Sequence, residues 1–131
     1  MKKKIKIVIN IIIIGFILIW LLLTYKDWNH KNDKVIKNGF YLTAIINKKS
    51  NSSGGTSTLD YYFIFNQLKI KSGNYVNDEY YIKKHIGDTI IIKTHKDLIP
   101  FSIVCEDIKY KSCMGKPPVN GWKQIPKCND K

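Results

Sequence analysis

The feature that most constrains this chain is an apolar run near its start, from Ile7 to Tyr25, in which Asn10 is the one strongly polar residue. As a helix, this run would span about 28 Å, close to the thickness of the hydrocarbon core of a bilayer. A cleavable signal peptide is the main alternative, but the run is longer than a usual apolar signal region and no small-x-small cleavage pattern follows it. We therefore expect residues 1–25 to be a short cytoplasmic stub and a transmembrane helix, which contacts membrane lipid through residues 7–25.

The charges on either side of the run predict its orientation. Four lysines and the amino terminus precede it closely, whereas four lysines follow it at wider spacing, so the positive-inside rule favours a cytoplasmic N-terminus. The lysines are Lys2, Lys3, Lys4 and Lys6 before the run and Lys26, Lys31, Lys34 and Lys37 after it. We expect a single-pass protein of the plasma (inner) membrane, with its C-terminal domain on the extracytoplasmic side.

The basic residues of the chain are all lysine. There are 22 of them, and the formal net charge of the 131-residue chain is +12. Arginine is the side chain best suited to reading base edges and to gripping phosphates with two hydrogen bonds, so its absence argues against specific recognition of nucleic acid. The abundance of Lys, Ile and Asn also suits an AT-rich genome. We expect no nucleic-acid partner, and a charge that acts through solubility and attraction to acidic surfaces.

Beyond the run, the composition predicts a short tether at residues 26–38 and one small β domain at residues 39–131. Apolar and polar residues alternate with a period of two in several segments, the pattern of half-buried strands. A two-residue hairpin turn is expected at Asn66 and Gln67, although Gln67 is not the glycine that such a turn prefers. Strands are expected at residues 39–47, 59–65, 68–71 with a closing Ser72-Gly73-Asn74, 89–94 and 101–105.

The predicted fold class is therefore mainly β: one N-terminal transmembrane helix, followed by a small antiparallel sheet or partly open barrel and an irregular C-terminal tail from about residue 106. Residues 48–58 contain no apolar side chain and predict a flexible, exposed loop. Residues 75–85 fit either strand pieces or a helical turn. The prolines of the tail exclude long regular elements there, and we expect the tail to pack back through Trp122.

Three cysteines allow one disulfide and one free thiol, in any of three pairings. They are Cys105, Cys113 and Cys128. The pair Cys113 and Cys128 is slightly favoured, because it would close a loop of about 15 residues in the irregular tail and contribute ~3 kcal/mol. The alternative is that all three thiols are free and that Cys105 is a buried strand residue. No spacing of Cys with His85 or His95 matches a zinc site, so we expect no metal-binding, cofactor-binding or catalytic residues.

Other residues of types that carry chemistry have simpler explanations. The acidic pairs at residues 78–79 and 106–107 are expected at exposed turns, and Gly54 and Gly55 lack the context of a phosphate-binding loop. Residues 61–63, with Lys69 and Lys71 opposite, could form an aromatic platform for stacking. Core packing explains one face of that strand without such a role.

Three segments follow one another in an order that resembles a known group of proteins. They are Tyr61-Tyr62-Phe63-Ile64-Phe65-Asn66, Ile86-Gly87-Asp88-Thr89-Ile90 and Leu98-Ile99-Pro100-Phe101-Ser102. This order resembles small membrane-anchored bacterial proteins of unknown function, in which a single N-terminal transmembrane helix precedes a small β-barrel-like domain. The resemblance covers roughly residues 39 to 105. It implies fold and topology, and it brings no active site.

These features predict a non-enzymatic envelope protein whose extracytoplasmic β domain binds a protein, a peptide or another envelope component, without a small-molecule cofactor. One alternative is a minor envelope redox factor or enzyme that uses the C-terminal cysteines, which would require an accessible thiol of low pKa. Another is an immunity-type membrane protein that acts through its helix. Asn10 suggests that possibility, because an amide within a membrane can pair with another helix.

Overall fold

The structure is a computed structural model, and it describes residues 2–128, with side chains from residue 5 onward. The chain divides into two compact units between Asp33 and Lys34. Each unit is described separately below. Met1 and residues 129–131, which belong to the predicted stub and tail, lie outside the described residues. The side chains of residues 2–4, on which the predicted orientation partly depends, also lie outside them.

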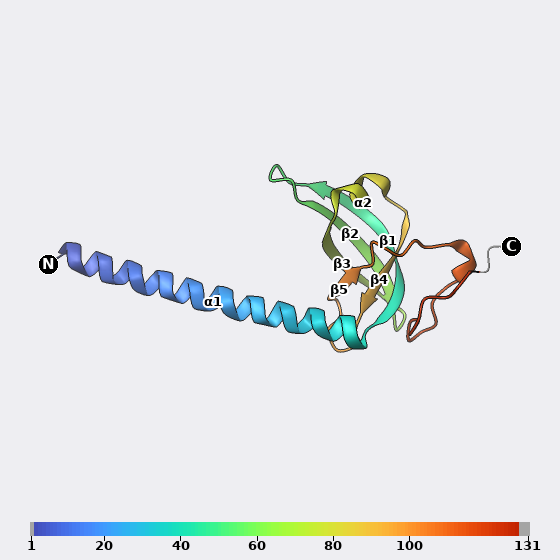
Figure 1. Cartoon of the computed structure of the whole chain (residues 1–131), viewed down its shortest axis with the longest axis horizontal. Coiled ribbons are helices and arrows are strands. Elements are labelled where there is room, and N and C mark those ends of the chain that lie inside the picture. The colour runs from blue at the N-terminus through green and yellow to red at the C-terminus, as the bar shows by residue number, and fades with distance from the viewer. Residues whose placement is uncertain (1, 129–131) are drawn as a thin grey trace. The chain divides into compact units, whose positions relative to one another are not determined.

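The first unit is the part of helix α1 that ends at Asp33, and the whole helix runs from Lys2 to Asn38 (Figure 1). Its apolar side chains are exposed on every side, and Phe16, for example, is 71% exposed. A helix that is apolar all round and unburied by protein is typical of a membrane span. By length and composition, α1 is a candidate membrane-spanning helix.

Residues 26–38, predicted as a tether, continue α1 as helix. An ion pair of 2.6 Å between Lys31 and Asp27, one helical turn apart, supports this polar continuation. The second unit begins at Lys34 instead of at residue 39, and Val35 is fully buried in it. The last turn of the helix thus supplies an apolar side chain to the second unit.

The second unit is a curled, five-stranded antiparallel sheet, or half-barrel, in the order β3-β2-β1-β4-β5 (Figure 1). This arrangement confirms the predicted fold class. The tail after β5 is irregular apart from a short 3-10 helix, η1, at Ser112–Met114. The strands are β1 (Phe40–Asn51), β2 (Ser57–Phe65), β3 (Leu68–Val76), β4 (Thr89–Thr94) and β5 (Ser102–Val104).

The core lies on one face of this sheet and follows the period-two alternation that the sequence predicts. Alternate residues of β1, β2 and β4 point to the same side because the strands pair in register, with Ala44 opposite both Phe63 and Ile90. These side chains bury the apolar surface that stabilises the domain. The buried members on this face are Leu42, Ala44, Ile46, Leu59, Tyr61, Phe63, Ile90 and Ile92.

The hairpin turn between β2 and β3 is confirmed as a two-residue turn. Asn66 and Gln67 have φ angles of 49° and 64°, in the left-handed region. Such a turn matches the twist of the two strands but favours glycine or asparagine. Gln67 therefore holds a backbone conformation that a glycine would adopt with less strain.

The structure corrects one other prediction and resolves one that was left open. The expected flexible loop at residues 48–58 is mostly strand, because β1 continues to Asn51 and β2 begins at Ser57. Polar residues fill this ribbon, and Ser50 pairs with Thr58. Within residues 75–85, β3 extends to Val76 and a helix, α2, then spans Asp78–Lys83, so each of the two alternatives holds for part of the segment.

Candidate functional site

The C-terminal tail forms a bridge to the start of β1. The backbone N–H of Tyr41 donates to the carbonyl of Trp122 at 2.8 Å, and the N–H of Trp122 donates back to Tyr41 at 2.9 Å. On this side of β1, pairing with β2 begins only at Ala44 and Phe63. Trp122, which is 9% exposed, therefore takes the position that β2 leaves free. The prediction that the tail packs back through Trp122 is confirmed.

Gly121 makes this approach possible. Its φ angle is +72°, and a Cβ at this position would lie 2.3 Å from Cδ2 of Phe40 and 2.7 Å from the carbonyl oxygen of Tyr41. Both distances are far below van der Waals contact, and L side chains rarely adopt that φ. The tail can reach β1 in this way only with glycine at position 121.

A groove of about 690 Å³ lies where β1 and β2 separate, between these strands and the tail segment Lys116–Val119. The strand residues Thr43, Ile45, Tyr62 and Ile64 contribute to its lining from the face opposite the core. The tail contributes Pro117, Pro118 and Val119. This lining is mainly apolar, and Ile64 and Val119 remain 55% and 72% exposed. Exposed apolar side chains around a concave surface are typical of a binding site.

Positive charge accompanies this apolar surface. Lys116 belongs to the lining, which contains no carboxylate among the described residues. Lys69 and Lys71 pair across the sheet with Ile64 and Tyr62, so they point to the same outer face. The groove therefore has an apolar floor and a cationic surrounding.

The aromatic platform considered from the sequence is reduced to one ring. Tyr61 and Phe63 point into the core, and Tyr62 alone of residues 61–63 lies on the outer face. The Nζ of Lys69 lies 3.8 Å from the centroid of the Tyr62 ring, a cation–π contact within the chain. This arrangement gives a single ring beside the groove and no series of rings on which successive bases could stack.

The structure joins Cys113 and Cys128 in a disulfide, with their Cα atoms 5.9 Å apart. Cys105 is free and half-buried, just after β5. Burial, together with the negative charge of Asp107, raises the pKa of its thiol to about 11. Cys105 is therefore a neutral thiol at physiological pH and does not supply the low-pKa thiol that a redox factor would need.

Three residues of the two acidic pairs make structural contacts at or within α2. Asp78 accepts a hydrogen bond of 2.6 Å from the Ser57 hydroxyl, and Glu106 accepts one of 3.1 Å from the backbone N–H of Asn77. Glu79 forms an ion pair with Lys83 at 2.5 Å. Because each of these carboxylates has a structural partner, they do not assemble a pair suited to acid–base chemistry.

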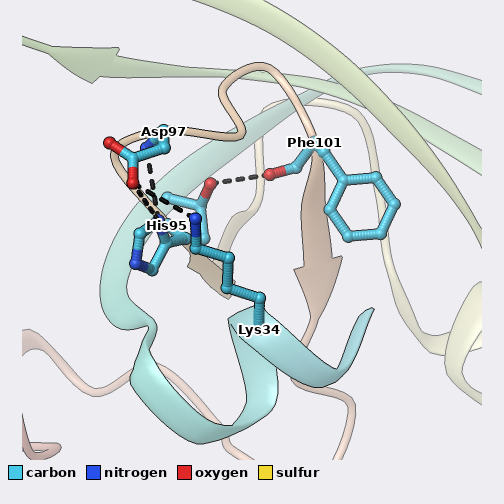
Figure 2. A network of polar contacts seen from close by, with 5 residues as sticks. Lys34, His95, Asp97 and Phe101 are labelled. Carbon is cyan, nitrogen blue, oxygen red and sulfur yellow. Dashed lines mark hydrogen bonds and ion pairs between the residues drawn. The ribbon is translucent and has the colours of Figure 1, made fainter. Parts of the chain in front are cut away.

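Metal ligands are also dispersed. Across residues 2–128, no group of three or more His, Cys, Asp and Glu side chains is placed to hold a metal ion. The side chain of His85 is 80% exposed beside Asp88. His95 lies in a separate network shown in Figure 2, with Lys34 and Asp97.

In that network, the last turn of α1 meets the loop after β4 (Figure 2). The Lys34 ammonium contacts Oδ2 of Asp97 at 3.2 Å, and this hydrogen bond is the main reason that the pKa of Asp97 is lowered. The backbone N–H of Asp97 donates to Nδ1 of His95 at 3.2 Å. Both contacts fix the position of the Asp97 carboxylate.

A buried hydroxyl cluster links strands at the two edges of the sheet. The Tyr61 hydroxyl donates to Asn74 at 2.5 Å and lies 2.8 Å from the Ser102 hydroxyl, which donates to Ser72 at 3.1 Å. Burial raises the pKa of Tyr61 to about 12. Every hydroxyl in the cluster has a partner, so the cluster serves to hold the half-barrel together.

Comparison of the chain with protein-family models, with curated proteins and with solved structures finds no match. The apolar helix and the curled sheet that the resemblance implied are present. The groove was not predicted, because its tail residues lie in a segment whose sequence indicates only irregular structure. The available signal was the apolar character of Ile45, Tyr62 and Ile64, which alternate with core residues and so point to the outer face, a face that is usually more polar.

Proposed function

We propose that this chain is a bacterial, single-pass membrane protein without enzymatic activity, and that its β domain binds a segment of a protein partner in the groove under Lys116–Val119. The observation that supports this proposal is the groove itself, which combines a concave apolar lining with exposed Ile64 and Val119. A disulfide within the tail restrains one wall of the groove. Restraint of this kind lowers the ordering cost of binding.

The chemistry of the groove defines the segment that it would bind. Apolar side chains of the partner would fill the space between Tyr62 and Pro118. A neighbouring Asp or Glu would meet the positive charge of Lys116 and Lys71. The bound segment is therefore a short extended peptide that carries both apolar and acidic side chains.

Site-specific photocrosslinking in native membranes tests this proposal. Val119 and Ile82 are each 72% exposed, but only Val119 lines the groove, so the two positions form a matched pair for a photoreactive amino acid. We expect a specific adduct from position 119 and none from position 82. Mass spectrometry of the adduct should identify a partner segment with apolar and acidic residues. Tyr62→Ala should reduce the yield about tenfold, as expected for the loss of an aromatic contact.

Two outcomes would count against the groove as the binding site. Equal labelling from positions 119 and 82 would indicate non-specific contact. An adduct from position 119 that persists unchanged in the Tyr62→Ala variant would place the partner elsewhere, provided that the variant keeps the circular dichroism of the parent.

The proposal also places α1 across the plasma membrane, with the β domain on the extracytoplasmic side. Its support is the long apolar helix and the denser lysines before the apolar run. We expect the intact chain to stay in the membrane fraction after carbonate extraction and to be digested by protease added to spheroplasts. A mature chain that begins near residue 25 would contradict the anchor, and full protection from protease would contradict the orientation.

A further inference from the structure

A second cavity, of about 560 Å³, lies at the hairpin turn between β2 and β3, where Asn66 also lines the groove described above. It belongs entirely to the second unit of the chain. Its chemistry differs from that of the groove, because its lining combines two aromatic rings with several polar side chains. The lining combines Phe40 and Phe65 with Asn38, Asn66, Asn120 and residues 95–97.

The floor of this cavity is aromatic. The rings of Phe40 and Phe65 are stacked, with centroids 5.5 Å apart and planes inclined by 21°. Both side chains are half-buried, so part of each ring contacts the core and part faces the cavity. An aromatic surface of this kind favours a ligand with a flat, apolar face.

Around this floor, three amide side chains are available. Within the described residues, the side chains of Asn38, Asn66 and Asn120 have no hydrogen-bond partner, and all three are exposed. Each amide offers two donor hydrogens and one acceptor oxygen. The rim can therefore both donate hydrogen bonds to a ligand group and accept hydrogen bonds from it.

The network in Figure 2 adds a carboxylate and an imidazole to the rim. Lys34 contacts Oδ2 of Asp97, which leaves Oδ1 as an acceptor for a ligand. Nδ1 of His95 accepts the N–H of Asp97, so in this neutral tautomer Nε2 carries the proton and can donate. The ion pair with Lys34 offsets the charge of Asp97, and Lys96 adds a positive charge to the same lining.

We propose that this cavity binds a neutral saccharide, a role separate from the peptide groove. Sugar hydroxyls both donate and accept hydrogen bonds, which matches the amides, Asp97 and His95, and the C–H face of a sugar ring matches the two phenylalanines. Lys96 also lines the cavity and carries a positive charge, so an anion is the competing ligand that the experiment must exclude.

Calorimetric titration of the full chain in lipid nanodiscs tests this site. The probes are chitotriose, cellotriose and maltotriose, with inorganic phosphate as the anionic comparison. We expect at least one trisaccharide to bind with a Kd of about 1 mM or below, and phosphate not to bind. Asn120→Ala should weaken binding about tenfold, because it removes amide hydrogen bonds from the rim.

Asn51→Ala is the matched control, since Asn51 is also an exposed asparagine but lies at the end of β1 and outside the cavity lining. It should leave the affinity unchanged. The proposal is overturned if none of the three trisaccharides binds or if phosphate alone binds. It is also overturned if the Asn120→Ala and Asn51→Ala variants bind the trisaccharide with equal affinity. Crosslinking from Val119 is measured independently, so failure of this site leaves the test of the peptide groove intact.

Discussion

At the scale of single residues, Lys49 shows how one side chain on a strand stabilises a helix that is distant in the sequence. Its ammonium group donates to the carbonyl of Tyr81 at 2.6 Å and also to the carbonyl of Lys84. The same group lies 4.2 Å from the centroid of the Tyr81 ring. The last carbonyls of a helix lack partners within the helix and carry partial negative charge, so a cation there both pairs and neutralises them.

Lys49→Met should therefore lower the free energy of unfolding by about 1–2 kcal/mol. Methionine keeps an unbranched apolar side chain of similar length, but the two charge-assisted hydrogen bonds of the ammonium group are lost. Lys48→Met is the control, since Lys48 is exposed and makes no such contact. Urea denaturation measures the difference, and hydrogen exchange should show faster opening of α2 in the Lys49 variant alone. Equal stability of the two variants would contradict the capping role.

The pKa of Cys105 gives a prediction that depends on pH. Because burial raises it to about 11, the folded chain should carry roughly a hundredfold less thiolate at pH 8 than a thiol of ordinary pKa, and iodoacetamide should react correspondingly slowly. The raised pKa contributes stability that is fully present below the ordinary thiol pKa and is lost as the pH rises through about 11.

The reaction rate is measured by mass spectrometry in the folded chain and in urea, where the thiol is unburied and should react at the ordinary rate. Fast alkylation of folded Cys105 at pH 7 would contradict this prediction. It would also support the redox alternative, because that role needs an accessible thiolate.

At the scale of elements, the strands could be predicted because their own residues determine them. In β2, for example, Leu59, Tyr61 and Phe63 alternate with less buried residues, and this period fixes both the strand and its core face. Helix α2 could not be predicted in the same way. Its own residues supply an N-cap at Asn77 and the ion pair between Glu79 and Lys83, which are local signals of a helical turn. Contacts from Ser57, Glu106 and Lys49, which no local pattern indicates, then hold its two ends in place.

The groove could not be predicted for a related reason. One wall is a strand surface whose exposed apolar residues the sequence does show, and the other is the tail segment 116–119, whose path no local pattern indicates. The path is set by Gly121, which lets the tail approach β1, and by the bridge between Trp122 and Tyr41. Both are interactions between segments about 80 residues apart. The periodicity of apolar residues reports local structure and gives no information on such contacts.

Gly121→Ala should consequently detach the tail and remove one wall of the groove. A Cβ at this position meets Phe40 and the backbone of Tyr41, in addition to the strain of the positive φ. Gly55→Ala is the control, because Gly55 has a φ of +79° but open space around it. We expect Gly121→Ala to cost about 2 kcal/mol or more beyond the control.

Denaturation and crosslinking from Val119 measure these two consequences. The Gly121 variant should lose both stability and the adduct, whereas the Gly55 variant should keep the adduct. If the two variants were equally stable and equally labelled, the close approach of the tail to β1 would not determine the groove.

At the scale of the whole molecule, the β domain includes a residue from the polar end of helix α1. Val35 lies in a helical segment rich in lysine and asparagine, yet it is 0% exposed. Beside it, Lys34 reaches Asp97, and Lys93 donates to the carbonyl of Ile36 at 2.6 Å. These contacts make the last turn of α1 part of the folded domain.

The final prediction compares Val35 with its neighbour in the full-length chain. Val35→Ala should lower the free energy of unfolding of the β domain by about 2 kcal/mol, because two buried methyl groups are removed from a packed site. Ile36→Ala removes more apolar atoms, but Ile36 is 52% exposed, so its cost should stay below about 0.5 kcal/mol. Urea denaturation followed by near-ultraviolet circular dichroism measures both variants. If neither variant lowered the free energy of unfolding, the domain would begin after the helix, near residue 39, as the sequence alone predicted.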